Sequence, residues 1–318
     1  MTNFSLGQAW VSRVTNASAA DVPIIGGDVS HAPEIAHFQA VLRELSVTET
    51  AREMVRRRWI QPKGIKDKVV ERGEALFDFL FTRPAHQPAF AMFKGRRLSA
   101  QRDLVVEIAT MAWVTHVLDS ARDNPPRKKF KPSNLSGDFT RWLAKLSVRD
   151  DGPTRALAAI REIGIGVVIE SGLPGMSVDG ASVHTRTAGP VLALTLRYDR
   201  LDNFWFTLLH ELGHIALHLS EPSDDVFIDS LEDSPSDELE SESEANAFAK
   251  DRLIPRDLWL RSDAYRLGTA GSVLSLANQI GVHPAIVAGR IRYERRDFRI
   301  FNDLVGMGEV RDVIFSNE

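Results

Sequence analysis

The chain has 318 residues, of which 43% are hydrophobic and 26% charged, a balance typical of a globular protein with two or three domains. It contains no cysteine, which excludes disulfide bridges and thiolate metal sites, so any bound metal must use histidine and carboxylate ligands. The formal net charge of -4 indicates no general attraction to nucleic acid.

The first 35 residues are rich in Ser, Ala, Gly and Pro without clear periodicity, and residues 1–35 are therefore predicted to form a loosely structured lead-in. They lack the basic start and continuous apolar stretch of a signal peptide, and no run of about 18 apolar residues occurs anywhere in the chain. We therefore expect a cytoplasmic protein that does not span a membrane.

Helical periodicity dominates the next part of the chain. Apolar residues recur three and four positions apart in EIAHFQAVLRELS, KDKVVERGEALFDFLF and QRDLVVEIATMAWVTHVLDSA. These segments predict an all-helical domain over residues 36–150. Within it, the sequence DNPP at residues 123–126 predicts the end of a helix and a hinge.

Charged residues are distributed unevenly along the chain. Basic clusters lie in the first half, at residues 52–58, 94–97 and 127–131. Residues 224–244 hold ten carboxylates and no Lys or Arg. We interpret the basic clusters as solvated faces and the acidic segment as a loop.

The pattern changes after residue 150, where an α+β domain is predicted over residues 151–262. A helix (TRALAAIREIG) leads into the β-branched run GVVIE, and a second run, PVLALTLR, follows a Gly-rich turn region, so a small sheet is expected. Two further helices are FWFTLLHELGHIALHL, which is apolar on nearly all sides, and ESEANAFAKDRLI, which ends before Pro255. A C-terminal helical segment follows over residues 263–318, with two helices separated at residues 281–284.

The predicted buried helix carries a metal-ligand pattern. His210 and His214 lie four residues apart, so their imidazoles project from one face and can share a metal ion. Glu211 completes the pattern H-E-x-x-H, in which the glutamate is the general base for the attacking water. Core histidines with hydrogen-bond partners are the alternative, but burying three titratable side chains among Phe, Trp, Leu and Ile is costly without a metal. The domain over residues 151–262 is therefore predicted to be a zinc metallopeptidase.

A catalytic zinc site takes three protein ligands and leaves a fourth position open. Glu242 is the preferred third ligand, because Asn246 lies one turn later on the same face and can hydrogen-bond a histidine ring. Glu244 is the rival, since it also precedes apolar positions of that helix. His218 continues the four-residue spacing, but a fourth ligand would close the site, so we expect it to support the site by hydrogen bonding.

At these residues the sequence resembles the ImmA/IrrE-type zinc metallopeptidases. The resemblance is carried by FWFTLLHELGHIALH and by ESEANAFAKDRLIP, where E-x-E-A-N-x-F-A followed by L-I-P is typical. It implies zinc ligands at His210, His214 and Glu242, with Glu211 catalytic. Members of that family cut DNA-binding repressors to release stress, phage or mobile-element genes, so the resemblance also implies a helix-turn-helix repressor as the substrate.

Further segments resemble a subgroup in which the peptidase domain is attached to HigA-like antitoxin regulators. These segments are RRRWI, AWVTHVL, AIREIGIGVVIE and IGVHPAIVAGRIRYE, so the likeness covers about residues 50–296. Such regulators usually begin with a helix-turn-helix, and residues 1–50 show no recognisable pattern of that kind. This departure weakens the expectation that the chain binds DNA directly.

The first functional hypothesis is a site-specific endopeptidase. The strand PVLALTLR, just before the active-site helix, could pair with an extended substrate segment. An oxyanion-stabilising donor is also expected, for which Tyr198, Tyr265 and His283 are candidates.

The second hypothesis is a DNA-binding or antitoxin-type regulator in which the zinc domain is sensory or structural. The spacing from Ala277 through Gly281 to Ile286, followed by several arginines, is compatible with a helix-turn-helix. A helical hairpin packed on the peptidase core is the simpler interpretation of that feature. A binding module that has lost its activity is disfavoured, because Glu211 would then have no chemical role.

Overall fold

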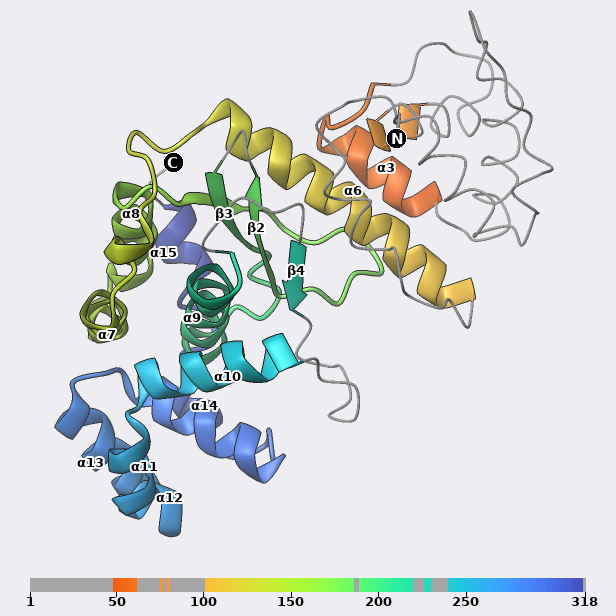
Figure 1. Cartoon of the computed structure of the whole chain (residues 1–318). Helices are drawn as coiled ribbons and strands as arrows, with labels where there is room; N and C mark the ends of the chain where they lie inside the picture. The colour runs from red at the N-terminus through yellow and green to blue at the C-terminus, as the bar shows by residue number, and fades with distance from the viewer. Residues whose placement is uncertain are drawn as a thin grey trace, which may run out of the picture. The chain divides into compact units, whose positions relative to one another are not determined.

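The structure of the protein is a computed structural model. It describes residues 48–61, 75–76, 79–80, 101–185, 189–219, 226–229 and 240–316. The chain divides into two compact units, which are described separately (Figure 1). In these ranges, no helix combines the length and the apolar character that crossing a bilayer requires.

The first unit contains the described residues up to Ser120, together with Gly172–Ser177. Its helices are α3 (Thr48–Arg56) and most of α6 (Gln101–Asp123). Helix α6 begins where the periodicity predicts and ends at Asp123, the first residue of the predicted break DNPP. The lead-in, the segment EIAHFQAVLRELS and most of KDKVVERGEALFDFLF lie outside the described residues, so the all-helical domain stays a prediction.

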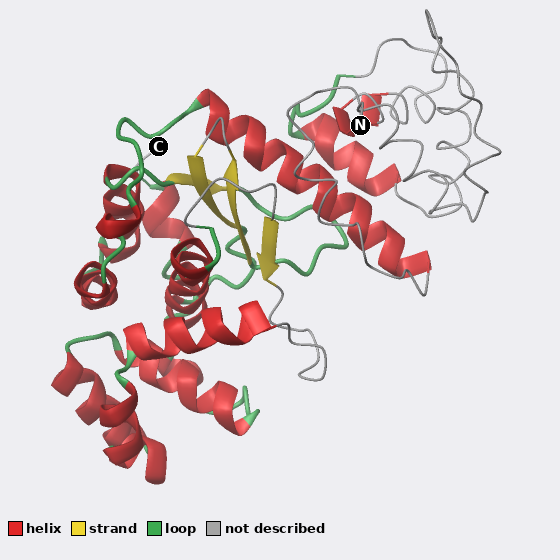
Figure 2. Ribbon diagram, in the orientation of Figure 1, coloured by secondary structure: helices red, strands yellow, loops and turns green. Residues whose placement is uncertain are grey.

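The second unit comprises Ala121–Ser171 and the described residues from Val178 onward. It combines a small sheet with many helices (Figure 2), as the α+β prediction for this part of the chain requires. Its helices and strands are, in chain order, α7 (Gly137–Lys145), α8 (Gly152–Glu162), β1 (Gly166–Ile169), β2 (Gly180–Thr185), β3 (Gly189–Leu194), α9 (Leu201–Leu217), β4 (Val226–Asp229), α10 (Glu240–Leu253), α11 (Arg256–Arg261), α12 (Asp263–Arg266), α13 (Ala270–Ile280), α14 (Pro284–Arg295) and α15 (Arg311–Phe315).

The sheet has four strands in the order β1-β3-β2-β4. Strand β3 pairs in parallel with β1 and antiparallel with β2, and β2 also pairs antiparallel with β4. The predicted strands GVVIE and PVLALTLR correspond to β1 and β3. Because β3 has a neighbour on both sides, its backbone groups are already used in the sheet. The expectation that PVLALTLR pairs with a substrate segment is therefore wrong.

Helix α9 is the predicted buried helix, and almost all of its residues are buried in the core of the second unit. Helix α10 packs on it through Ala245, Ala249 and Leu253, which recur every four residues on one face. The two helices are in close contact at Gly213 of α9, where an added Cβ would lie 3.2 Å from the Cα of Ala245. This contact brings the first turn of α10 beside the HELGH sequence.

The two predicted C-terminal helices are α13 and α14, which form a helical hairpin. Helix α13 ends at Gly281, which has a left-handed φ of 73°, and His283 caps the start of α14. Helix α14 packs against both α13 and α9. The N-terminal half of α14, residues 285–288, is buried in the core of the unit. A helix-turn-helix would present that half to DNA bases, so the geometry favours the packed hairpin.

A C-terminal segment secures the start of α9. The backbone N–H groups of Leu201 and Asp202 donate to the carbonyl oxygens of Gly306 and Val305, at 3.1 and 3.4 Å. The Asp199 carboxylate accepts hydrogen bonds from the backbone of residues 310 and 311, at 3.1 and 2.9 Å. These bonds satisfy N–H groups that a helix leaves open at its N-terminus, and we call residues 305–311 the C-terminal clamp.

Residues before and after the predicted 151–262 domain contribute to the same core. Leu143 and Ala144 of α7, and Val287 and Ile291 of α14, belong to the hydrophobic cluster around α9. The predicted divisions after residues 150 and 262 fall inside this unit, and the separate stability of those parts stays a prediction.

Candidate metal centre and active site

Three side chains from α9 and α10 converge on one point. The Nε2 atoms of His210 and His214 are 3.0 Å apart. The two carboxylate oxygens of Glu242 each lie 3.3 Å from one of these nitrogens. Both histidines are fully buried, whereas the Glu242 side chain is 23% exposed. The three candidate ligands therefore meet at the edge of the core.

The spacing of these atoms fits a divalent metal ion. Nitrogen and oxygen ligands at about 2.0–2.1 Å from a tetrahedral ion lie about 3.3 Å from one another. Two buried imidazole nitrogens that face each other repel unless a proton or a cation lies between them. Two imidazoles and a carboxylate also form a ligand set that leaves one coordination position open, as a catalytic site requires.

The protonation states at this site favour metal binding. Burial by itself raises the pKa of Glu242, but hydrogen bonds and charge from His210 and His214 outweigh it and lower that pKa to about 2. Burial lowers the pKa of His214 below 6.5, against the opposing effect of Glu242. At neutral pH the carboxylate is ionised and the His214 imidazole is neutral, and these forms bind metals.

Glu211 is fully buried between α9 and β2. Its Oε2 accepts a 2.7 Å hydrogen bond from the hydroxyl of Ser182 on β2. Gly180, two residues earlier on the same face of β2, leaves room for the carboxylate, since an added Cβ would lie 2.5 Å from Oε1. Two small residues of β2 thus supply the space and the donor that hold Glu211 next to His210.

Sequence reasoning did not identify Ser182 or Gly180 as part of the site. The signal was the alternation in GASVH, where Gly180, Ser182 and His184 share one face of the strand. His184, at the far end of this face, lies with Nδ1 2.7 Å from the carbonyl oxygen of Leu219, just after α9. This face of β2 therefore lies along α9, from Glu211 to Leu219 just after the helix.

The structure separates the two rival glutamates of α10. Glu242 faces His210 and His214, whereas the carboxylate of Glu244 lies 3.6 Å from Nε2 of His218. The same nitrogen of His218 lies 3.2 Å from the carbonyl oxygen of Ser241. His218 thus joins the end of α9 to the first turn of α10, a position that suits the predicted supporting role.

Asn246 lies one turn after Glu242 on α10 and is partly buried. Its predicted hydrogen bond to a histidine ring stays a prediction.

The three candidate oxyanion donors have structural contacts of their own. The ring of Tyr198 lies under the guanidinium of Arg200, at 5.2 Å, and Tyr265 packs edge-on against Trp259, at 5.7 Å. His283 accepts a hydrogen bond from the backbone at the start of α14. None of these contacts places the three side chains at the metal ligands.

Comparison with known proteins agrees with this geometry. Residues 161–292 match the model of the IrrE N-terminal-like domain, the Peptidase M78 family. Residues 161–292 form an ImmA/IrrE-type metallopeptidase domain. No curated protein and no solved structure matched the chain.

The metallopeptidase domain contains every residue of the candidate site. It begins in α8, includes the sheet, α9 and α10, and continues through α13 into α14. His210, His214 and Glu242 form the one cluster of three potential metal ligands found in the described ranges. The C-terminal clamp lies after the matched residues.

Proposed function

We propose that the chain is a zinc-dependent endopeptidase that cleaves a DNA-binding repressor or an antitoxin-type regulator. The observation that carries the proposal is the meeting of His210, His214 and Glu242 directly beside a buried Glu211. This combines a three-ligand metal site with a general base, the two parts that metal-assisted peptide hydrolysis needs.

Zinc held by His210, His214 and Glu242 would supply a Lewis acid for the scissile carbonyl and lower the pKa of the attacking water. Glu211 accepts the proton of that water on its carboxylate and passes it to the leaving amine. Ser182 holds Oε2 of Glu211, so the carboxylate is oriented before substrate binds.

The proposed substrate class rests on the likeness to ImmA/IrrE-type peptidases, whose members cut DNA-binding repressors. Incubating the zinc-loaded protein with each repressor encoded near its gene, and sequencing any fragments, would identify the substrate. A panel that remains intact under conditions where the protein holds zinc would contradict the repressor proposal.

The central test is the variant Glu211→Gln. Glutamine keeps the size of the side chain but cannot accept the water proton, so zinc content should stay stoichiometric. Proteolysis should slow by about two to four orders of magnitude, the usual contribution of a general base. Unchanged cleavage with full zinc content would refute the assigned role of Glu211.

The alternative is a regulator in which the zinc domain is sensory or structural. A reporter assay on the neighbouring promoter separates the two hypotheses by comparing Glu211→Gln with His214→Ala. Equal loss of regulation supports the peptidase. Loss with His214→Ala alone supports the regulator, because only that variant removes a metal ligand.

A further inference from the structure

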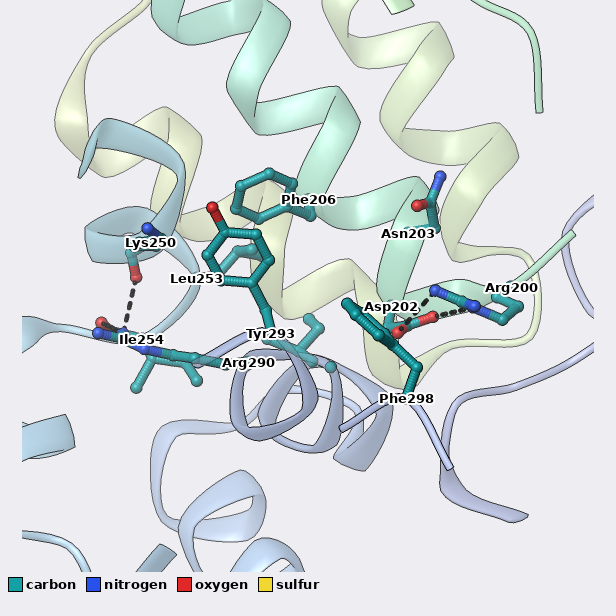
Figure 3. Close-up of a pocket in the computed structure, with 12 residues that line it drawn as sticks. Arg200, Asp202, Asn203, Phe206, Lys250, Leu253, Ile254, Arg290, Tyr293 and Phe298 are labelled. Carbon is teal, nitrogen blue, oxygen red and sulfur yellow. Dashed lines mark hydrogen bonds and ion pairs between the residues drawn. The ribbon is translucent and has the colours of Figure 1, made fainter. Parts of the chain in front are cut away.

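A row of three aromatic rings leads away from the metal site. The Phe206 ring centroid is 6.1 Å from that of His210, and 6.3 Å from that of Tyr293 on α14. Phe206 precedes His210 by one turn of α9, so both side chains lie on the same face of that helix. The close-up in Figure 3 shows Phe206 and Tyr293 side by side.

Phe206 and Tyr293 belong to the lining of a pocket between α9, α10 and α14. Its apolar wall is completed by Leu253, Ile254, Ile286 and, after α14, Phe298. Tyr293 and Phe298 are 43% and 55% exposed, so the pocket reaches the surface, while Ile254 and Ile286 are buried. Such a wall suits a large apolar or aromatic side chain.

The charged residues of the pocket are mostly positive. Lys250, Arg200 and Arg290 line it together with one carboxylate, Asp202. Asp202 is paired with Arg200, at 2.9 Å, and Arg290 with Glu294, also at 2.9 Å. The ammonium of Lys250 lies 4.8 Å over the ring of Tyr293. A Lys or Arg side chain that packed on the Tyr293 ring would therefore meet the like charge of the Lys250 ammonium at short range.

The distance from the metal site fits a neighbouring residue of a bound peptide. An extended chain advances about 3.3 Å per residue, so the ring of Phe206 lies within about two residues of a scissile bond held at the metal ligands. A side chain that points from such a residue toward Phe206 would enter the pocket. The pocket and the metal site are thus joined at the half-buried side chain of Phe206 on α9.

We propose that this pocket binds the large apolar side chain of a substrate residue beside the scissile bond, and rejects Lys and Arg there. The inference rests on the proposed endopeptidase function. It adds a preference for the substrate residue beside the scissile bond, which the proposed function does not specify. It makes Phe206 and Tyr293 the residues that select the substrate, and Lys250 the residue that excludes basic side chains.

The test uses the full-length, zinc-loaded protein and a mixture of synthetic peptides of varied sequence, with cleavage sites read by mass spectrometry. The wild type should favour Phe, Leu, Ile or Met at one position beside the cut, and disfavour Lys and Arg there. Lys250→Glu should raise the rate for Lys or Arg at that position by about tenfold, because it reverses a charge at a few ångströms. Lys131→Glu makes the same charge change at an exposed residue outside the pocket and should leave the profile unchanged.

Cleavage with no apolar preference beside the cut, or an unchanged profile in Lys250→Glu, would overturn the pocket assignment and leave the endopeptidase function standing. If the wild type cuts no peptide, the endopeptidase function is refuted. A binding experiment then tests whether the pocket takes an apolar side chain. N-acetylphenylalaninamide should then shift NMR signals of Phe206 and Tyr293 in the zinc-loaded protein, and N-acetyllysinamide should not. Equal behaviour of the two probes would overturn the assignment.

Discussion

Ser182 contacts Glu211 directly and helps to fix its orientation. Its hydroxyl donates to Oε2 of a fully buried carboxylate, a hydrogen bond to a charged group of the kind worth about 1.5–3 kcal/mol. Ser182→Ala should therefore lower kcat by about tenfold or more, while zinc content stays stoichiometric. Thr140→Ala, which removes another buried hydroxyl in α7, is the control and should leave kcat unchanged. A normal kcat in folded Ser182→Ala would show that Glu211 needs no such support.

The pKa values at the metal site predict how zinc affinity changes with pH. The pKa of His214 is lowered below 6.5 and that of Glu242 lies at about 2, so both groups are in their metal-binding forms above pH 6.5. Affinity measured by competition with a chelator should be constant from pH 8 to about pH 6.5. Further acidification protonates His214, and affinity should then fall by up to about tenfold per pH unit for each proton taken up. A fall that begins above pH 7 would contradict the assigned ligands.

At the scale of elements, the contact between α9 and α10 positions the third ligand. Gly213→Ala adds a Cβ that would lie 3.2 Å from the Cα of Ala245 and 3.3 Å from its carbonyl oxygen, both of which are backbone atoms of α10. We expect α10 to shift, with a loss of about 1–3 kcal/mol in unfolding free energy and weaker zinc binding. Thermal unfolding with and without zinc would measure both effects.

Gly271 offers a matched control for that experiment. It is also a helical glycine, but an added Cβ there meets nothing within 4 Å. Gly271→Ala should raise the unfolding free energy by about 0.5–1 kcal/mol, the usual helix preference of alanine. Equal effects of the two variants would mean that helix propensity, not the α9–α10 contact, governs position 213.

Most helices of the second unit could be predicted from sequence, because burial of one face leaves a clear periodicity. Helices α8, α10, α13 and α14 follow such patterns, whereas α9 was predictable because its sequence is apolar on nearly all sides. Strand β2 could not be predicted in this way, since it lies in the segment interpreted as a Gly-rich turn region. Its first residue, Gly180, has no side chain and so leaves room for Glu211 and Thr207, and the run Gly-Ala-Ser at its start carries little strand signal.

The candidate metal-ligand motif was predictable from sequence, but the residues that surround it were not. The four-residue spacing of His210 and His214 is a local property of one helix, so sequence alone suffices. The choice of Glu242 over Glu244 rested on a pattern in α10, and the structure places Glu242 at the two histidines. Ser182 contacts Glu211 only through tertiary packing, and no fixed spacing in the sequence predicts this contact.

At the scale of the whole molecule, the linker after α6 should be the most accessible site for proteases among the residues that the structure describes. Residues 127–129 and Lys131 are exposed, and most of the segment before α7 has no regular structure. Limited trypsin treatment should cut there first and leave a fragment that retains zinc, because all three ligands lie downstream. First cuts inside residues 160–215 would show that this boundary is wrong.

The C-terminal clamp should be essential to the catalytic unit although it lies outside the matched domain. Ending the chain at Leu304 removes the acceptors for the backbone N–H groups of Leu201 and Asp202. Gly306 also packs directly on Leu201, with space for no side chain, since an added Cβ would lie 2.6 Å away. We expect the truncated protein to unfold at lower denaturant concentration and to lose zinc more readily. Unaltered stability would show that water replaces these bonds without cost.

The C-terminal clamp is synthesised after the helix that it stabilises. Synthesis runs from the N-terminus, so α9 and its histidines leave the ribosome well before residues 305–311 exist. Until then the start of α9 lacks its hydrogen-bond acceptors, and the core around it lacks Val305 and Val310. A nascent chain thus carries His210, Glu211 and His214 before the helix that bears them has its hydrogen-bond acceptors, so we expect the candidate metal site to become ordered only after residues 305–311 have been translated.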